Sequence, residues 1–266
     1  MSDKANKADQ AVRRRSANPL VNHFGQYRSE GVVTEVGEVT PTLRRIRIRS
    51  EELIEREYTP GQHVRVEIRD PLSLYGIVRP GETLRTYTIR ELSRERGEFE
   101  LWAHLYEGEG IGLEWARSVR SGDPVRLWGP QGEPELEPEV ERAPYHLFVG
   151  EETGACAFEP LLTELGPNTR TFGVLESDTP EDEVPVSGLG QVVRVHRNGE
   201  SAASSPLLPA AVAAMELPDE PGFALVAGEA RTGQAVRAHL VNERGWPREA
   251  VRVKAFWTPG RKGLHH

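Results

Sequence analysis

The run Arg85-Thr86-Tyr87-Thr88-Ile89-Arg90 places two guanidinium forks, an aromatic ring and two hydroxyls along one segment. Threonine and tyrosine favour strand, and the preceding Pro80-Gly81 favours a turn, so successive side chains should alternate between two faces. Arg85 and Tyr87 then share a face. There an arginine fork matches a diphosphate, a tyrosine ring can lie against an isoalloxazine, and a neighbouring hydroxyl can reach a flavin's redox nitrogen. The run alone fits an ordinary exposed strand equally well.

A glycine-rich segment follows in Gly108-Glu109-Gly110-Ile111-Gly112, between a strand that ends near His104 and a helix expected over Leu113–Val119. Glycines let the backbone approach a phosphate closely, and the start of a helix offers free amides and a positive dipole end. The spacing is not the dinucleotide fingerprint, because the last glycine comes too early. Taken alone, the segment favours a plain turn; placed after the Arg85 strand, it can supply a second phosphate contact.

The two halves of the chain differ in their pattern of predicted secondary structure. Short β-like runs fill the first half and predict an antiparallel barrel: Gly31–Val39, Thr42–Arg49, His63–Ile68, Arg85–Arg90, Phe99–Leu105 and Pro124–Trp128. Within Thr42–Arg49 isoleucines alternate with arginines, so the arginines are expected to face solvent.

Apolar runs alternate with helical segments in the second half, which predicts a parallel sheet covered by helices. The expected strands are Tyr145–Val149, Thr171–Leu175, Gln191–His196, Phe223–Ala227 and Val251–Phe256. The expected helices are Cys156–Leu165, Leu207–Met215 and Thr232–Glu243.

Ligands of parallel sheets bind at the carboxyl ends of the strands. Here those ends are the segments 150–153, 176–178, 228–231 and 257–260. Each also fits a simple connection, and the aromatic pair Phe256-Trp257 fits a core plug. The adjacent carboxylates Glu151 and Glu152 are expected on a solvated turn rather than in acid–base work.

Composition narrows the class of protein. Charged residues make up 28% of the chain and the formal net charge is -8, which argues against a general affinity for nucleic acid or anionic membranes. The single cysteine, Cys156, cannot form an internal disulfide or hold an iron–sulfur cluster, and no metal-ligand spacing is present. No apolar run suits a membrane span or a secretion signal. We therefore expect a cytoplasmic protein, and any redox centre should be an organic cofactor.

These landmarks, in this order, resemble the siderophore-interacting proteins, a family of FAD-dependent ferric-siderophore reductases related to the ferredoxin-NADP reductase superfamily. The run Arg85–Arg90 is similar to the family's Arg-x-Tyr-Thr-x-Arg flavin motif, and 99–115 is similar to its second flavin segment. Gly150-Glu151-Glu152-Thr153 resembles Gly-Asp-Glu-Thr, Gly228-Glu229-Ala230 resembles Gly-Glu-Ala, and 256–260 resembles Tyr-Trp-x-x-Gly. The resemblance covers about 27–260. It implies an FAD-binding β-barrel domain over 19–141 and an NAD(P)H-binding-like α/β domain over 142–266. Residues 1–18 lie outside it; they are polar and lack apolar periodicity, which predicts a disordered arm.

The resemblance also implies the site. Arg85 would hold phosphate, Tyr87 and Thr88 would serve the flavin ring and its redox edge, and Arg90 would support the phosphates or the strand. The full set of implied cofactor residues is Arg85, Thr86, Tyr87, Thr88, Arg90, His104, Gly110, Ile111, Gly112, Leu113, Thr153 and Trp257. Ile111-Gly112-Leu113 departs from the family's Pro-Ala-Ser type of segment, so backbone amides replace a hydroxyl there. Phe256 likewise lacks the hydroxyl of the usual tyrosine.

The implied activity is transfer of electrons from NADH or NADPH through FAD to ferric iron held by a siderophore; a ferredoxin is another donor that the resemblance allows. No catalytic acid or base and no metal site is expected, since cofactors carry such chemistry. Cations that could attract an acidic iron complex are Arg231, Lys254, Arg261 and Lys262. Two alternatives remain open at this point: a related flavoprotein reductase with a protein or free-flavin acceptor, and a non-catalytic siderophore-binding protein.

Overall fold

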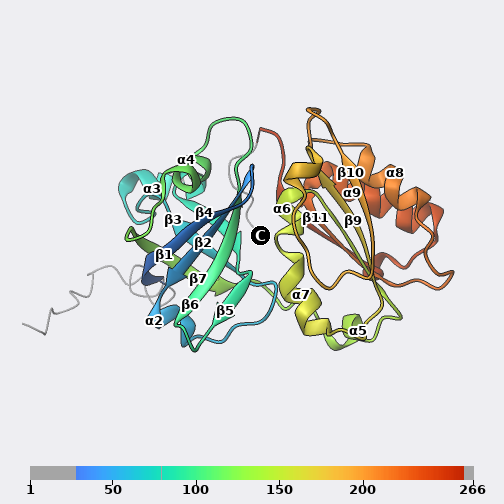
Figure 1. Ribbon diagram of the computed structural model, residues 1–266, viewed down its shortest axis with the longest axis horizontal. Coiled ribbons are helices and arrows are strands. Elements are labelled where there is room, and N and C mark those ends of the chain that lie inside the picture. The colour runs from blue at the N-terminus through green and yellow to red at the C-terminus, as the bar shows by residue number, and fades with distance from the viewer. Residues whose placement is uncertain (1–27, 79, 261–266) are drawn as a thin grey trace, which may run out of the picture.

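An antiparallel, barrel-like sheet forms the N-terminal half of the protein. In the computed structural model, which describes residues 28–78 and 80–260, its strands run in the order β4-β3-β7-β1-β2-β6-β5 (Figure 1). Their bounds are β1 Arg28–Thr40, β2 Leu43–Arg49, β3 His63–Glu67, β4 Leu84–Thr88, β5 Glu91–Ser93, β6 Glu98–His104 and β7 Pro124–Gln131. Short helical elements join them: α2 Glu51–Ile54, α3 Leu74–Val78, η1 Pro80–Glu82, α4 Ile111–Ser118 and α5 Pro138–Glu141.

Strand β2 shows how sequence alternation builds this sheet. Ile46 and Ile48 are fully buried in the barrel core, while Arg45 and Arg47 lie on the other face. The arginines do not simply face solvent as expected, because both pair with Glu35 and Glu100 from the neighbouring strands. Cross-strand pairing of opposite charges stabilises the register of three strands.

The barrel-like sheet is not closed. Beyond the edge strand β4, the amide of Ile89 donates to the carbonyl of Gln62 at 3.0 Å, and the amide of Arg90 donates to that of Glu100 at 2.8 Å. The chain therefore bridges from β3 towards β6 just after the candidate flavin run.

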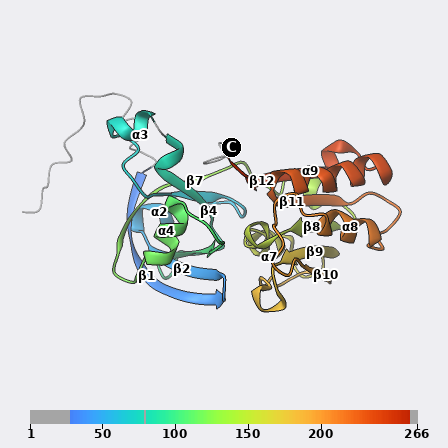
Figure 2. The ribbon, with the colours of Figure 1, turned by 90° about the horizontal axis from the view of Figure 1, so that it is seen from above.

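The C-terminal half contains a parallel sheet in the order β10-β9-β8-β11-β12. Its strands are β8 His146–Gly150, β9 Thr171–Ser177, β10 Gln191–His196, β11 Phe223–Glu229 and β12 Val251–Trp257. The helical elements are α6 Glu152–Ala155, α7 Phe158–Leu165, η2 Pro180–Asp182, α8 Leu207–Ala214, α9 Ala230–Ala238, η3 His239–Glu243 and η4 Arg248–Ala250. Helices α6 and α7 cover the face towards the barrel, and α8 and α9 cover the opposite face (Figures 1 and 2).

The predicted fold class is confirmed: an antiparallel barrel-like sheet precedes an α/β unit with a parallel sheet. Every predicted strand is present within a few residues of its expected bounds. Helix α6 was not predicted, because its four residues are too short to show a periodic apolar pattern. The predicted helix over Thr232–Glu243 is split into α9 and a π-helical turn.

The two halves share one apolar cluster. Leu43 from the barrel is buried together with Phe148 and Phe158 from the α/β half, and Trp102 packs against the same group. A continuous core across the junction fixes how the two sheets meet. In the part of the chain that the structure describes, no helix has the length and apolar character needed to cross a membrane.

Candidate functional site

Arg85, Tyr87 and Gly112 come together although 25 residues separate the last two. The Tyr87 hydroxyl donates to the carbonyl of Gly112 at 3.2 Å, and its ring lies 5.4 Å from that of Trp115. A Cβ on Gly112 would lie only 2.6 Å from Cγ of Arg85. Glycine is therefore the residue that lets the arginine lie flat against the start of α4.

Helix α4 begins with unpaired amides beside that arginine. Its first intrahelical bond runs from the amide of Glu114 to the carbonyl of Gly110, so the amides of Ile111, Gly112 and Leu113 precede the helical ladder. Gly110 has no side chain with which to cap them. Free amides and a positive dipole end next to a guanidinium suit an anion such as a diphosphate.

Arg85 keeps a donor for such a ligand. Its Nη1 donates to the carbonyls of Gly81 and Leu84 at 2.8 and 2.7 Å, which fixes the guanidinium without neutralising its charge. Among the described residues Nη2 makes no hydrogen bond. Burial lowers the pKa of Arg85 and raises that of Tyr87. These residues fit the diphosphate of FAD, with an aromatic side chain at hand for its ring.

On the same strand Thr86 is exposed, whereas Thr88 is half-buried opposite His63. The contact of either hydroxyl with a flavin stays a prediction.

Arg90, at the end of the run, reaches into the other half of the protein. It pairs with Glu159, donates to the carbonyls of Cys156 and Pro185 at 3.3 and 3.0 Å, and lies 3.4 Å over the ring of Trp102. Its guanidinium therefore connects the two halves.

His104 also lies at the junction. Its Nε2 is 4.0 Å from Oε1 of Glu152, and its ring is 6.2 Å from that of Tyr106. The second flavin segment and the first loop of the α/β half are thereby adjacent, as the predicted site requires.

The carboxyl ends of the parallel strands carry buried acids. Glu151 is 2% exposed and Glu152 is 1% exposed, so the expectation that they sit on a solvated turn is wrong. Glu151 accepts the Thr153 amide at 2.7 Å, the Thr153 hydroxyl, and the Trp257 indole N–H at 2.9 Å. Burial, together with the nearby charge of Glu152, raises the pKa of Glu151.

Glu152 and Glu176 share a buried arginine. Arg197 donates to Glu152 at 2.6 and 3.0 Å and to Glu176 at 3.2 Å, while the hydroxyl of Ser205 donates to Glu176 at 2.7 Å. Burial opposes the charge on Arg197, but its bonds to Glu152 outweigh that effect and raise its pKa. Burial raises the pKa of Glu176.

The four candidate cations have different surroundings. Arg231 is exposed at the start of α9. The ammonium of Lys254 bonds Glu135 at 2.6 Å and the carbonyl of Gly61 at 3.2 Å. Arg261 and Lys262 lie outside the described residues. A role at a substrate stays a prediction for all four.

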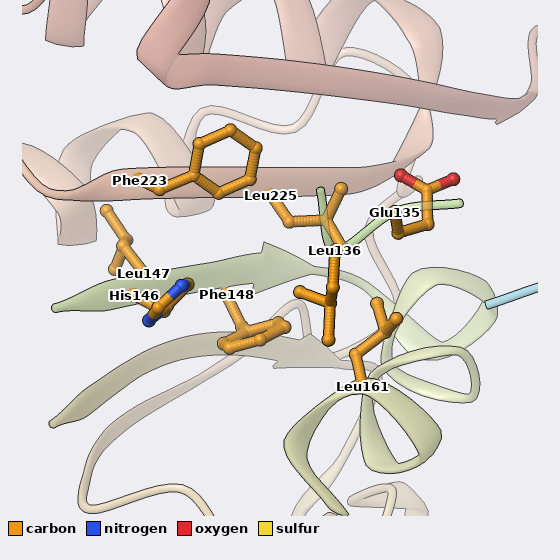
Figure 3. Close-up of a pocket in the computed structure, with 8 residues that line it drawn as sticks. All are labelled: Glu135, Leu136, His146, Leu147, Phe148, Leu161, Phe223 and Leu225. Atoms are coloured by element: carbon orange, nitrogen blue, oxygen red, sulfur yellow. The ribbon is translucent and has the colours of Figure 1, made fainter. Parts of the chain in front are cut away.

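A small cavity lies away from this region, between the connecting segment and the sheet (Figure 3). Its lining is mostly apolar, with Glu135 and His146 as the polar members. The space suits about one water molecule. Nδ1 of His146 has no hydrogen-bond partner within the described structure, so such a water would satisfy it. The cavity is too small for a flavin or an iron chelate.

Sequence reasoning missed Arg197. It applied the strand-end rule to four strands but not to β10, although Arg197 directly follows His196 at the end of that strand. The signal was therefore present. The engagement of Arg90 with Glu159 had no such signal, because the two residues are 69 positions apart.

Comparison with known proteins agrees with this arrangement. The family model described as "Siderophore-interacting protein" matches residues 143–260, and the one described as "Siderophore-interacting FAD-binding domain" matches residues 79–134. The mycobactin import ATP-binding/permease protein IrtA of Mycolicibacterium smegmatis is 27% identical over 91% of this chain, which covers 27% of that protein's length. The ferric vibriobactin reductase ViuB of Vibrio cholerae is 26% identical over 84% of this chain and 86% of its own length.

Solved structures share the fold. A siderophore utilization protein from T. fusca superposes with a TM-score of 0.76 at 22% identity, covering 90% of this chain and 95% of its own. The ferredoxin reductase of carbazole 1,9a-dioxygenase superposes with a TM-score of 0.65 at 19% identity, covering 86% and 69%. The combination of an antiparallel sheet and a parallel α/β sheet is thus common to these proteins.

Proposed function

Because the chain belongs to the siderophore-interacting family of FAD-binding proteins, we propose that it reduces ferric iron held by a siderophore, with FAD as its cofactor. The observation that carries the proposal is the free start of α4 beside Arg85, with Tyr87 on the same strand face. This is an anion site joined to an aromatic surface, as a flavin dinucleotide requires. The relative ViuB, named as a ferric vibriobactin reductase, supports the choice of substrate class.

When bound, FAD would supply the redox chemistry that links a two-electron donor to the one-electron reduction of two ferric ions. The chain's own residues position the parts. Arg85 and the amides of 111–113 would hold the diphosphate, Tyr87 would contact the flavin ring, and Thr88 would serve its redox edge. Trp257 and Thr153 would line the flavin from the parallel sheet. Hard oxygen ligands of a siderophore favour ferric iron, so reduction weakens the complex and lets the metal leave.

We further propose that the electron donor is NADH, NADPH or a reduced ferredoxin, that the reaction takes place in the cytoplasm, and that basic side chains attract the iron complex. Exposed Arg231, with Arg261 and Lys262 beyond the described residues, supplies positive charge for an acidic complex.

The first test is reduction of a ferric siderophore by the FAD-loaded protein in the presence of a ferrous-trapping dye. The protein is bleached with one equivalent of dithionite and freed of excess reductant before the ferric siderophore is added, so that the reduced flavin is the electron source and no biological reductant is needed. We expect flavin bleaching followed by stoichiometric dye colour. A bleached protein that yields no colour with any ferric siderophore contradicts the proposed function, and faster turnover with free flavin or ferredoxin favours the related reductase instead.

The matched variants are Arg85→Ala and Arg126→Ala. Loss of a charge-assisted pair to the diphosphate should weaken FAD binding by about a hundredfold in Arg85→Ala. Arg126 is an exposed arginine on β7, and its removal should leave FAD binding unchanged. FAD binding is measured by quenching of flavin fluorescence. Equal affinities of the two variants would contradict the assignment of Arg85.

A further inference from the structure

The parallel sheet has a point at which its strand order reverses. From β8 the chain proceeds outward to β9 and β10, then returns to place β11 and β12 on the other side of β8. In open α/β sheets a dinucleotide binds in the crevice at such a point, with its diphosphate on the amides of the adjoining helix starts. Here the crevice is bordered by the segment from β8 to α6 and the segment from β11 to α9.

Both segments already hold carboxylates of the chain itself. Glu151 Oε2 accepts the amide of Thr153 in the first turn of α6 at 2.7 Å. Glu229 Oε2 accepts the amides of Arg231 and Thr232 at the start of α9 at 3.0 and 2.9 Å. Each glutamate is 2% exposed. The amides that would receive a diphosphate are therefore occupied by buried acids.

The glycine of the second segment has an unusual neighbour. Gly228 has a φ of +130°, and a Cβ there would lie 2.4 Å from Oε1 of Glu151. In dinucleotide-binding turns a glycine gives space to the diphosphate. In this chain the space beside Gly228 contains the Glu151 carboxylate, which the Trp257 indole holds from its other side.

Apart from exposed Arg231 in the first turn of α9, the charged groups of the crevice are also unfavourable for an anion. Glu152 lies next to Glu151, and the guanidinium of Arg197 is shared between Glu152 and Glu176. The start of α4 differs, because among the described residues its first amides are uncapped and Arg85 lies beside them. Of the two positions at which the fold could bind a diphosphate, the one in the α/β half has its amides bonded to buried glutamates, whereas the one in the barrel half has uncapped amides beside an arginine. A nicotinamide dinucleotide does not fit the α/β position in the way that FAD fits the barrel position.

We propose that Glu151 and Glu229 take the place of the donor's diphosphate, so that the α/β half recognises no more than the nicotinamide-ribose portion of a reduced nicotinamide nucleotide. The inference rests on the proposed flavoprotein reductase function and specifies its donor site. Glu151 is then a specificity-determining residue. The adenosine half of NADH or NADPH adds nothing to the affinity.

The direct test is calorimetric titration of the FAD-loaded protein with ADP-ribose, which has the diphosphate but no nicotinamide. We expect no binding up to about 1 mM for the wild type. The variants Glu151→Gln and Glu151→Ala remove the charge, the second also freeing the amide of Thr153, and we expect at least a tenfold gain in affinity. Glu181→Gln, which alters an exposed acid of η2, is the matched control and should bind no better than wild type. Thermal unfolding establishes that each variant is folded.

A kinetic comparison completes the test. Reduced nicotinamide mononucleotide and NADH should bleach the flavin with the same kcat/KM within about threefold. Wild-type binding of ADP-ribose with a Kd below about 100 µM, or a hundredfold advantage of NADH, overturns the inference. A folded Glu151→Ala protein without any gain overturns it as well. If neither nucleotide bleaches the flavin, the α/β half does not recognise the nicotinamide-ribose portion, and the inference is overturned. Failure of the reductase function itself would appear separately, as a dithionite-bleached protein that leaves ferric siderophores unreduced.

Discussion

Replacing Arg90 by methionine should loosen the connection between the two halves of the protein. The Arg90 side chain is 7% exposed, and its guanidinium has four partners: Glu159, the carbonyls of Cys156 and Pro185, and the ring of Trp102. Burial lowers the pKa of Arg90 to about 10, so the side chain is still charged at neutral pH. Methionine keeps the aliphatic stem and removes the charge and every donor.

The size of the effect follows from these contacts. Hydrogen bonds from a charged donor contribute about 1.5 kcal/mol each, and the stacking on Trp102 contributes about 1 kcal/mol. Glu159 is 30% exposed and regains water when its partner is removed, which reduces the loss. We therefore expect the free energy of unfolding of the FAD-free protein to fall by about 2 to 4 kcal/mol.

The assay is urea unfolding followed by tryptophan fluorescence, with Arg96→Met as the control. Arg96 pairs with Glu91, but both side chains are about half exposed, so its loss should change the free energy by less than about 0.5 kcal/mol. If Arg90 acted mainly on the flavin phosphates, Arg90→Met would leave the FAD-free protein as stable as the control and weaken only FAD binding. That result would refute the assignment of Arg90 to the junction.

Three further variants test the buried acids. Since burial and the charge of Glu152 raise the pKa of Glu151, the folded protein binds that proton more tightly than the unfolded chain, and the contribution of Glu151 to stability falls as pH rises above about 4.3. Glu151→Gln should therefore gain stability relative to wild type as pH rises above this value, and a constant difference in urea titrations would contradict this. Arg197→Met should lower the free energy of unfolding by about 3 to 5 kcal/mol and half-exposed Arg194→Met by less than about 1, measured by the same titrations. Gly228→Ala should lower the melting temperature more than Gly97→Ala, because both have positive φ but a Cβ meets another atom only at Gly228.

The sequence predicts the strands of both sheets well because their apolar periodicity is local. In β2, Ile46 and Ile48 repeat at every second position and both are buried. The alternation of strands and helices in the second half also predicts correctly that the polar strand-end residues lie together at the carboxyl ends of the parallel strands. The strand-end loops do meet, as the bond from Trp257 to Glu151 demonstrates.

What the sequence could not predict depends on distant partners. A Glu-Glu pair after a glycine is typical of an exposed turn, and the buried carboxylate of Glu151 has a distant partner in the indole of Trp257, 106 residues later, beside its local bonds to Thr153. Arg90 ends the candidate run 85–90, yet its side chain contacts Glu159 and Trp102 at the junction of the two halves. Alternation along a strand gives the face of a side chain but not the element that will cover that face.

The apolar cluster around Leu43, Phe148 and Phe158 determines which piece of this protein can be moved as a unit. A cut in the segment between β7 and β8 would leave Leu43 and Trp102 bare on one fragment and Phe148 and Phe158 bare on the other. Each fragment would then expose a contiguous apolar surface and tend to aggregate. A gene fusion can therefore transplant the pair of sheets but neither sheet alone.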